Sequence, residues 1–418
     1  MKRWFYRILS LMLSFGILGA CLLCCASYGD RTENRDASSS PLPAGGKALQ
    51  KPEEEPLEKE EQMRGVWVPF MCLDMTGTDR SEESFRLRMK EICENISSIG
   101  CNTLILQVRP FGDALYTSSY YPSSHLIVGE QGNPMTFDPL AVALTEAKRC
   151  HLRLHAWVNP FRVQTQKTPS LLSSDNPAQQ WITNPDSEKR RNVLTTENGL
   201  MLNPASEEVR KLIINGVREI ASRYEVDGIQ IDDYFYPDND EECDREEYEA
   251  YCKKAGDLPL SHSEWRKQNI NSLISGMAEA IHEAREGCVF GISPQCNLEN
   301  NEKMGADVEA WGAVKGYADY LCPQVYVSPD HPYLPFAEAI KEWRELIKNP
   351  DAAFYVGIAL YKLGTDADEG TWLLRDGLIA EECRCAEENG ADGVMLYSYE
   401  YLMTEQAQQE LQQAFSKE

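Results

Sequence analysis

The fold is decided by residues 227–237, which read DGIQIDDYFYP. Successive side chains of a strand point to opposite faces, so the alternation in this stretch sorts its residues into two sets. Ile229 and Ile231 are expected to face a layer of helices. Gln230 and Asp232 then face the other way, and Asp232 lies at the carboxyl end of the strand, next to Asp233.

Around this stretch, short apolar strands alternate eight times with amphipathic helices. The predicted strands cover residues 65–70, 103–109, 153–159, 228–234, 289–294, 320–326, 353–361 and 393–399. The predicted helices lie near 82–99, 138–149, 207–224, 264–285, 306–317, 335–347, 374–389 and 404–416. Ser206 before Glu207 and Glu208 is a good helix start, an N-cap with acids in the first turn. The pattern predicts a (β/α)8 TIM barrel rather than a doubly wound sheet.

Long loops follow the predicted strands and short ones precede them. The segments 110–137, 163–205 and 235–263 are strand-to-helix loops, whereas 100–102 and 225–227 are the short returns. In such barrels the strand-to-helix loops gather at the carboxyl-terminal face, where active sites lie. We therefore expect a binding site at that face.

Polar and aromatic side chains occupy the inward positions at the ends of several strands. Parity places inward Gln107, Arg109, Arg153, His155, Trp157, Asn159, Gln230, Asp232, Gln324, Tyr326, Met395, Tyr397 and Tyr399. Barrels normally fill their interior with branched aliphatic residues, and buried polar groups cost several kcal/mol unless they are hydrogen-bonded. A satisfied polar network remains the alternative for any one of these residues, but together they indicate a site.

Composition narrows the function classes. The chain has 418 residues, 42% of them hydrophobic, which excludes a wholly disordered chain and a multi-span membrane protein. Its 41 basic and 66 acidic residues give a net charge of −25, which repels phosphate backbones, so no nucleic-acid partner is expected. Aromatic residues in the long loops suit a carbohydrate ligand; they are Phe111, Tyr116, Tyr120, Tyr121, Phe161, Trp181, Tyr236, Tyr333 and Trp372.

The N-terminus reads as an export signal. A basic start precedes the apolar run 8–20, which is too short for a comfortable membrane span and ends in Leu18-Gly19-Ala20-Cys21. This ending resembles a bacterial lipobox, so we expect a lipoprotein signal peptide at 1–20 and lipidation at Cys21. An ordinary signal peptide or an uncleaved anchor is the alternative. Residues 21–63 then form a lipidated, disordered tether and 64–418 form the barrel, anchored outside the cytoplasm to the cell membrane.

Cysteine usage gives no metal site. Of 14 cysteines, Cys93, Cys101, Cys150 and Cys322 lie in apolar settings and are predicted to fill the core. After the tether, no pair of CxxC motifs has zinc-finger spacing. We expect neither a metal nor a cofactor. The sequence does not decide whether any of the cysteines form disulfides.

Several motifs in order resemble the glycosyl-hydrolase-like family 10, bacterial exported (β/α)8 proteins related to glycosidases. They are RGVWV at 64–68, QVRP at 107–110, HAWVNPFR at 155–162, YEVDGIQIDDYFYP at 224–237, CPQVY at 322–326 and GVMLYSYE at 393–400. The resemblance spans about residues 64–402 and implies a barrel, an exported location and glycoside hydrolysis, in some members of peptidoglycan glycan strands. The stretch from Asp227 to Asp232 is also similar to chitinase-type barrels, which place a glutamate acid where this chain has Tyr234.

Glycosidases usually need two carboxyls that flank the scissile bond. Asp232 is the predicted ionised partner, with Asp233 beside it. Glu400, among tyrosines after the eighth strand, is predicted to carry the proton of the general acid; Asp113 and Glu299 are weaker candidates. The predicted substrate-binding residues are Arg109, Asp113, His155, Asn159, Arg162, Tyr234, Gln324, Tyr326 and Tyr397.

These residues and the family resemblance together predict a monomeric glycoside hydrolase. The resemblance implies that it cleaves peptidoglycan glycan strands or a related polysaccharide. The alternative is a glycan-binding lipoprotein on a catalytically weakened barrel. A metal-dependent deacetylase is disfavoured, because His155 has no second histidine at metal-ligand spacing.

Overall fold

The computed structural model describes residues 62–165, 168–237 and 241–415. The predicted signal peptide, Cys21 and all but the last two residues of the predicted tether lie outside the described residues. Eight parallel strands close into a barrel in the order β1-β11-β10-β9-β8-β7-β3-β2. They are β1 (Met63–Val68), β2 (Thr103–Arg109), β3 (Arg153–Val158), β7 (Gly228–Ile231), β8 (Val289–Ile292), β9 (Tyr320–Leu321), β10 (Ala353–Ala359) and β11 (Gly393–Tyr397). The predicted TIM barrel is confirmed.

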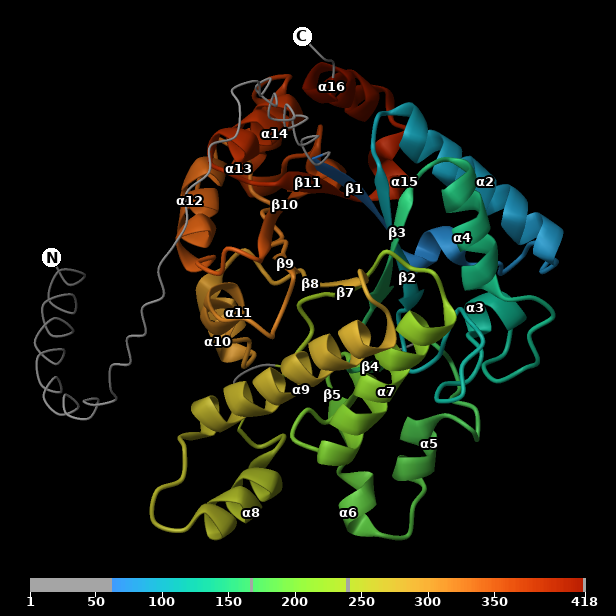
Figure 1. Ribbon diagram of the computed structural model, residues 1–418, viewed down its shortest axis with the longest axis vertical. Helices are drawn as coiled ribbons and strands as arrows, with labels where there is room; N and C mark the ends of the chain where they lie inside the picture. The colour runs from blue at the N-terminus through green and yellow to red at the C-terminus, as the bar shows by residue number, and fades with distance from the viewer. Residues whose placement is uncertain (1–61, 166–167, 238–240, 416–418) are drawn as a thin grey trace, which may run out of the picture. The chain divides into compact units, whose positions relative to one another are not determined.

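Helices follow the strands and cover the outside of the barrel, as Figure 1 shows. The long ones are α2 (Glu82–Ser98), α4 (Pro139–Arg149), α7 (Glu207–Arg223), α9 (His262–Ala284), α12 (Phe336–Leu346), α14 (Leu378–Glu388) and α16 (Glu405–Phe415). Two short helices, α10 (Leu298–Lys303) and α11 (Val308–Ala313), cover β8 and β9. Ser206 caps α7 as predicted, because its side chain accepts from the Val209 amide at 3.3 Å.

The two faces of the strands bury different residues. Ile229 and Ile231 belong to the large apolar layer between strands and helices, as their parity predicted. The barrel interior holds a separate cluster made of Met63, Trp67, Ile105, Trp157, Tyr320, Cys322 and Met395. Glycine makes room for the Tyr320 ring of this cluster, since a Cβ on Gly291 would lie 1.9 Å from it.

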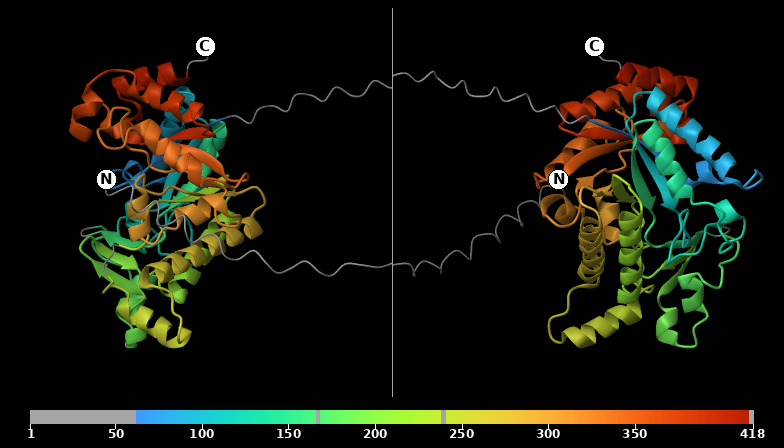
Figure 2. Two further views of the ribbon diagram at one scale, coloured as in Figure 1. Left: turned by 90° about the vertical axis from the view of Figure 1, so that its left-hand side faces the viewer. Right: turned by 45° about the vertical axis from the view of Figure 1, so that its right-hand side comes forward.

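The loop that follows β3 is more structured than the sequence predicted. It folds into an antiparallel sheet in the order β4-β6-β5, formed by β4 (Arg162–Thr165), β5 (Val193–Thr196) and β6 (Gly199–Leu202). It also carries α5 (Pro177–Ile182) and α6 (Ser187–Arg190), which lie near α8 (Arg245–Ala255) from the next long loop (Figures 1 and 2). Arg191 joins the two loops through ion pairs to Glu246 and Glu247. Four-residue strands are too short to show an alternation, which is why sequence reasoning missed them.

The cysteines that the sequence placed in apolar settings, Cys93, Cys101, Cys150 and Cys322, are free thiols. Cys93, Cys101 and Cys322 are buried as predicted, and Cys150 is half-buried. Among the described residues, no helix is both long enough and apolar enough to cross a bilayer.

Candidate active site

A cavity of about 330 Å³ opens at the carboxyl ends of the strands. Its lining comes from most of the barrel and from β4, and consists of Trp67, Pro69, Phe70, Met71, Gln107, Trp157, Arg162, Asp232, Asp233, Tyr234, Ser293, Gln324, Tyr326, Tyr361 and Tyr397. Seven of the predicted site residues line it: Arg162, Asp232, Asp233, Tyr234, Gln324, Tyr326 and Tyr397. The cavity lies at the face where barrel enzymes hold their active sites.

Asp232 forms the floor of this cavity. Its Oδ2 accepts from Trp157 Nε1 at 3.2 Å and from the side-chain amide of Asn159, and its carboxyl is also hydrogen-bonded by the Tyr234 backbone. Asn159 is held in turn by Gln107, whose Nε2 donates to its Oδ1 at 2.6 Å. Burial raises the pKa of Asp232 to about 7; the nearby Arg162 opposes the shift and the charge of Asp233 adds to it. Asp232, which the sequence predicted to be ionised, is therefore present in both its protonated and its ionised form near neutral pH.

Asp233 lies beside Asp232 and nearer to solvent, since it is half-buried where Asp232 is only 4% exposed. Its Oδ1 accepts from Gln324 Nε2 at 3.1 Å, and the same amide donates to the Ser293 carbonyl at 3.0 Å. Burial also raises the pKa of Asp233, against hydrogen bonds from Gln324 and Gln295. Two interacting carboxyls that each resist ionisation behave as one unit that holds a proton near neutral pH.

The small sheet holds Arg162 over the cavity. Arg162 begins β4 and pairs with Met201 of β6, and its guanidinium lies 4.3 Å from the centre of the Tyr234 ring. Tyr234 is 53% exposed, so this pair forms the outer edge of the site. Such a cation–π pair holds the two side chains against each other at the edge of the cavity.

Aromatic rings make up the wall opposite the acids. Tyr397 packs edge-on against Trp67 at 6.0 Å between centroids and lies 5.6 Å from Tyr326. Tyr361 adds a further edge-on contact with Tyr397 at 6.0 Å. This wall offers apolar faces of the kind on which the C–H faces of sugars pack.

The inward orientation predicted for Arg109 is wrong. The pairing of β2 with β3 slips between Gln107 and Arg109, and this irregularity turns the Arg109 side chain to the outside of the barrel. Its guanidinium lies over the Tyr121 ring at 4.3 Å, and a Cβ on Gly216 of α7 would be 2.5 Å from Arg109 Nη1. Arg109 therefore does not reach the cavity.

Two other predicted binding residues lie away from the cavity. His155 does face the barrel interior, but one layer below the mouth, where its Nδ1 lies 2.9 Å from the Tyr320 hydroxyl. Burial lowers the pKa of His155 to about 3, so it is neutral. Asp113 is buried in the loop after β2, where its Oδ2 contacts His125 Nδ1 at 3.1 Å and accepts from Gln131 Nε2 at 2.9 Å. Neither lines the cavity, and Asp113 organises a loop.

The candidates for a general acid across the cavity also lie elsewhere. Glu400, in α15 (Tyr399–Leu402), is exposed rather than enclosed by tyrosines, and it does not line the cavity. Its charge does act on Tyr397 at the edge of the cavity. Burial raises the pKa of Tyr397 to about 12, and the charges of Tyr234 and Glu400 add to this shift. Glu299 is exposed on α10 and pairs with Lys303 at 2.9 Å, which lowers its pKa instead of raising it.

Sequence reasoning missed part of the aromatic wall. Trp67, Phe70 and Tyr361 line the cavity, although the sequence had suggested loop aromatics as the sugar platform. Seven of those nine loop aromatics are buried in their loops, and only Tyr120 and Tyr333 are exposed. The parity of β1 was the signal that could have found Trp67, because it alternates with the outward residues Val66 and Val68.

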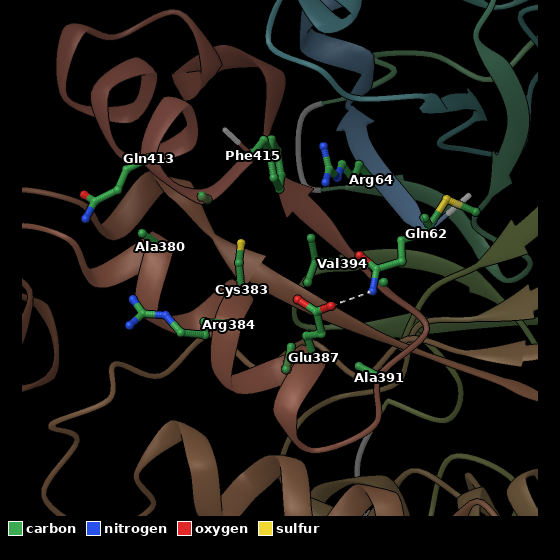
Figure 3. A pocket seen from close by; sticks show the side chains of 14 residues that line it. Gln62, Arg64, Ala380, Cys383, Arg384, Glu387, Ala391, Val394, Gln413 and Phe415 are labelled. Atoms are coloured by element: carbon green, nitrogen blue, oxygen red, sulfur yellow. Dashed lines mark hydrogen bonds between the residues drawn. The ribbon is translucent and has the colours of Figure 1, made fainter. Parts of the chain in front are cut away.

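A larger cavity of about 490 Å³ lies at the opposite face of the barrel, between β1, β11, α14 and α16 (Figure 3). Arg64 stacks on Phe415 there at 4.5 Å, and Gln62 Nε2 donates to Glu387 at 3.2 Å. Glu387 is the one acid in its lining among the described residues, so this cavity does not present a carboxyl pair. The active sites of TIM barrels lie at the other face, at the carboxyl ends of the strands.

Comparisons with known proteins agree with the barrel fold and show the family of the chain. The chain is 29% identical over 403 residues to glycosyl hydrolase DigH of Escherichia coli, covering 88% of this chain and 89% of that protein. It is 29% identical over 334 residues to glycosyl hydrolase YngK of Bacillus subtilis, covering 74% and 63%. The PgaB glycoside hydrolase domain of Bordetella bronchiseptica shares the fold, with a TM-score of 0.56, 14% identity and coverage of 86% and 100%. The family model described as Glycosyl hydrolase-like 10 matches residues 62–373, and the chain belongs to that family.

Proposed function

We propose that this protein is a glycoside hydrolase that cleaves the glycan strands of peptidoglycan or a related polysaccharide. The observation that carries the proposal is the carboxyl pair Asp232–Asp233 in an aromatic cavity at the catalytic face of the barrel. An acid that holds a proton near neutral pH can protonate a leaving oxygen. Membership of the glycosyl hydrolase-like family and relatives named glycosyl hydrolases support the same reaction class.

A second function competes with this proposal. No acid besides Asp232 and Asp233 lines the cavity in the described residues, which is the arrangement expected of a barrel that binds glycans and no longer cleaves them. Incubation of the purified protein with peptidoglycan and with chitin oligomers, followed by mass analysis of the products, separates the two. Shortened glycans support hydrolysis, and retention of glycans without products supports binding alone.

We also propose a location for the protein at the outer side of the cell membrane. A lipidated Cys21 would hold the barrel outside the cytoplasm on the cell membrane, next to the cell wall. We propose that the tether 21–63 lets the cavity reach glycan strands beyond the membrane surface.

A further inference from the structure

A row of tyrosine rings runs from the cavity to the surface on the β11 side of the barrel. Tyr397 ends β11 and lines the cavity, and its ring lies edge-on at 6.0 Å from that of Tyr361, which also lines the cavity. The next ring belongs to Tyr401, whose centroid lies 6.3 Å from that of Tyr361. Tyr401 is outside the cavity lining and is 40% exposed. The row therefore continues the aromatic wall outward, beyond the edge of the cavity.

The short helix α15 fixes the position of Tyr401. The Tyr399 hydroxyl accepts from Asn95 Nδ2 of α2 at 2.9 Å, and Leu402 is fully buried, so both ends of this helix are anchored. The Tyr401 carbonyl oxygen accepts from the Thr404 hydroxyl at 2.9 Å. A ring on an anchored backbone loses little conformational freedom when a ligand packs on it, so less of the binding energy is lost to ordering.

A second exposed tyrosine lies on the opposite side of the barrel mouth. Tyr234 follows β7, and β7 is four strands away from β11 in either direction around the eight-stranded barrel, so the two strands lie across from each other (Figure 1). The cavity with Asp232 and Asp233 spans the space between them, because Tyr234 lines one side of it and Tyr361 and Tyr397 line the other. A linear polymer that crosses the mouth therefore meets exposed rings on both sides of the acids.

An exposed carboxylate accompanies Tyr401. It belongs to Glu400, the preceding residue of α15. Burial raises the pKa of the Cys72 thiol to about 12, and the charge of Glu400 adds to this shift. Cys72 lies in η1 (Phe70–Leu73), which gives Met71 to the cavity lining, so Glu400 lies near that edge of the cavity. An apolar ring beside a hydrogen-bond acceptor suits a sugar, whose C–H face packs on the ring while its hydroxyls donate to the carboxylate.

We infer that Tyr401, with Glu400 beside it, forms an outer sugar-binding site that only glycan chains longer than the cavity can reach. The inference rests on the proposed function and specifies it: the protein prefers long strands to short fragments, and Tyr401 determines this preference. The contact lies outside the cavity that holds Asp232 and Asp233, so it stabilises the bound substrate and the transition state equally. Such a contact lowers KM and leaves kcat unchanged.

The first test measures binding across a ladder of chain lengths. Peptide-free peptidoglycan glycan strands are partially hydrolysed, separated by length and titrated calorimetrically into Asp232→Asn protein, so that binding is measured on intact chains. We expect the affinity to rise ~10-fold at the length that reaches Tyr401, and this step to disappear when Tyr401→Ala is added. Tyr401→Phe keeps the ring and should keep the step. Met403→Ala is the matched control, because Met403 is also 40% exposed and lies two residues farther along the chain.

The second test measures turnover in protein that keeps Asp232. Tyr401→Ala should raise KM for long strands ~10-fold with kcat unchanged, and it should leave kcat/KM for the shortest cleaved fragments as in the wild type. The side chain is exposed, so the Tm of the variant should stay close to that of the wild type. A fall in kcat on long and short substrates alike would contradict a site that acts by binding alone.

The outcomes separate this inference from the proposed function. A wild-type affinity that does not depend on length, a step that survives Tyr401→Ala, or an equal loss in Met403→Ala would overturn the inference and leave glycoside hydrolysis standing. A step that depends on Tyr401, in a protein that cleaves no fraction of the ladder, would support the inference and overturn hydrolysis. If no fraction is bound or cleaved, both are wrong.

Discussion

Asp232 is the residue on which the proposed chemistry depends most directly. Its Oδ2 accepts hydrogen bonds from two side chains, and the residue lines the cavity. Asp232→Asn keeps the shape and removes the charge, so turnover of glycan strands should fall at least ~100-fold while the protein still folds. The measurement is product release by mass analysis at saturating substrate. Glu130→Gln, an exposed change on the loop after β2, is the matched control, and near-normal turnover of Asp232→Asn would remove Asp232 from the mechanism.

Burial of Asp232 also predicts how stability depends on pH. Its pKa is about 7 in the folded protein against about 3.9 in an unfolded chain, so the folded state binds more protons in between. The contribution of this group is therefore most favourable below about pH 4 and is lost as the pH rises toward 7. Urea unfolding of the wild type and of Asp232→Asn between pH 4 and 8 measures it: the variant should gain stability relative to the wild type as the pH rises.

The difference between the two proteins reports on Asp232 together with its interaction with Asp233. Glu382 is fully buried with neither carboxyl oxygen partnered, and burial raises its pKa well above the ordinary range, so it acts in the same direction. Because Glu382 is present in both proteins, its effect cancels in the comparison. Stability curves that run parallel from pH 4 to 8 would show that Asp232 titrates normally.

At this scale the sequence predicted orientation well wherever a strand is regular. The parity of β7 placed Gln230 and Asp232 inside the barrel, where Gln230 accepts from Trp67 Nε1 at 2.6 Å. The same rule failed for Arg109, because one irregularity in the β2–β3 pairing reverses every later side chain. Sequence alone also could not show that Glu400 is exposed, since the path of the chain after β11 depends on tertiary packing.

Among the secondary-structure elements, the small sheet β4-β6-β5 has a specific role, because it carries Arg162 to the cavity. Gly199 permits the tight pairing: its φ is +129°, and a Cβ there would lie 2.2 Å from the Gln164 carbonyl oxygen. Gly199→Ala should displace β4 and lower kcat/KM at least ~10-fold, because small displacements of positioning groups are costly in turnover. Kinetics and thermal unfolding of the same variant test this.

The control is Gly256→Ala at the end of α8. Gly256 also has a positive φ, +76°, but nothing lies within 4 Å of a Cβ built there. It should show the ~1–3 kcal/mol cost of backbone strain without loss of kcat/KM. If Gly199→Ala unfolds the protein no more than Gly256→Ala and keeps full activity, the small sheet does not position the site.

The main elements of the barrel were predictable and the elements inside its loops were not. All eight strands and the long helices follow from periodicity, since each buries a continuous face. The strands β4, β5 and β6 bury little and are held by one another, so their existence depends on a register that periodicity does not encode. The same loops decide which side chains enclose the cavity, and for that reason the site was less predictable than the fold.

For the molecule as a whole, the barrel should fold without the segment that precedes it. Residues 60–418 form one compact unit. A chain of residues 63–418 should therefore be a soluble monomer with the thermal stability of the full-length mature protein. Light scattering and thermal unfolding measure both properties. A dimer, or a large fall in Tm, would show that the preceding residues contribute to the fold or that the barrel assembles.

The proposed lipid anchor at Cys21 predicts where the whole molecule is found in the cell. Leu18-Gly19-Ala20-Cys21 places small residues before a thiol that can take a lipid, and Cys24 and Cys25 follow closely. Cys21→Ala should leave the protein unprocessed or release it from the membrane fraction, whereas the matched changes Cys24→Ala and Cys25→Ala should leave it lipidated and membrane-bound. Fractionation with mass analysis of the mature N-terminus distinguishes these cases. A Cys21→Ala protein that is still lipidated would move the anchor to a neighbouring cysteine, and a wild type cleaved without a lipid would make the segment an ordinary signal peptide.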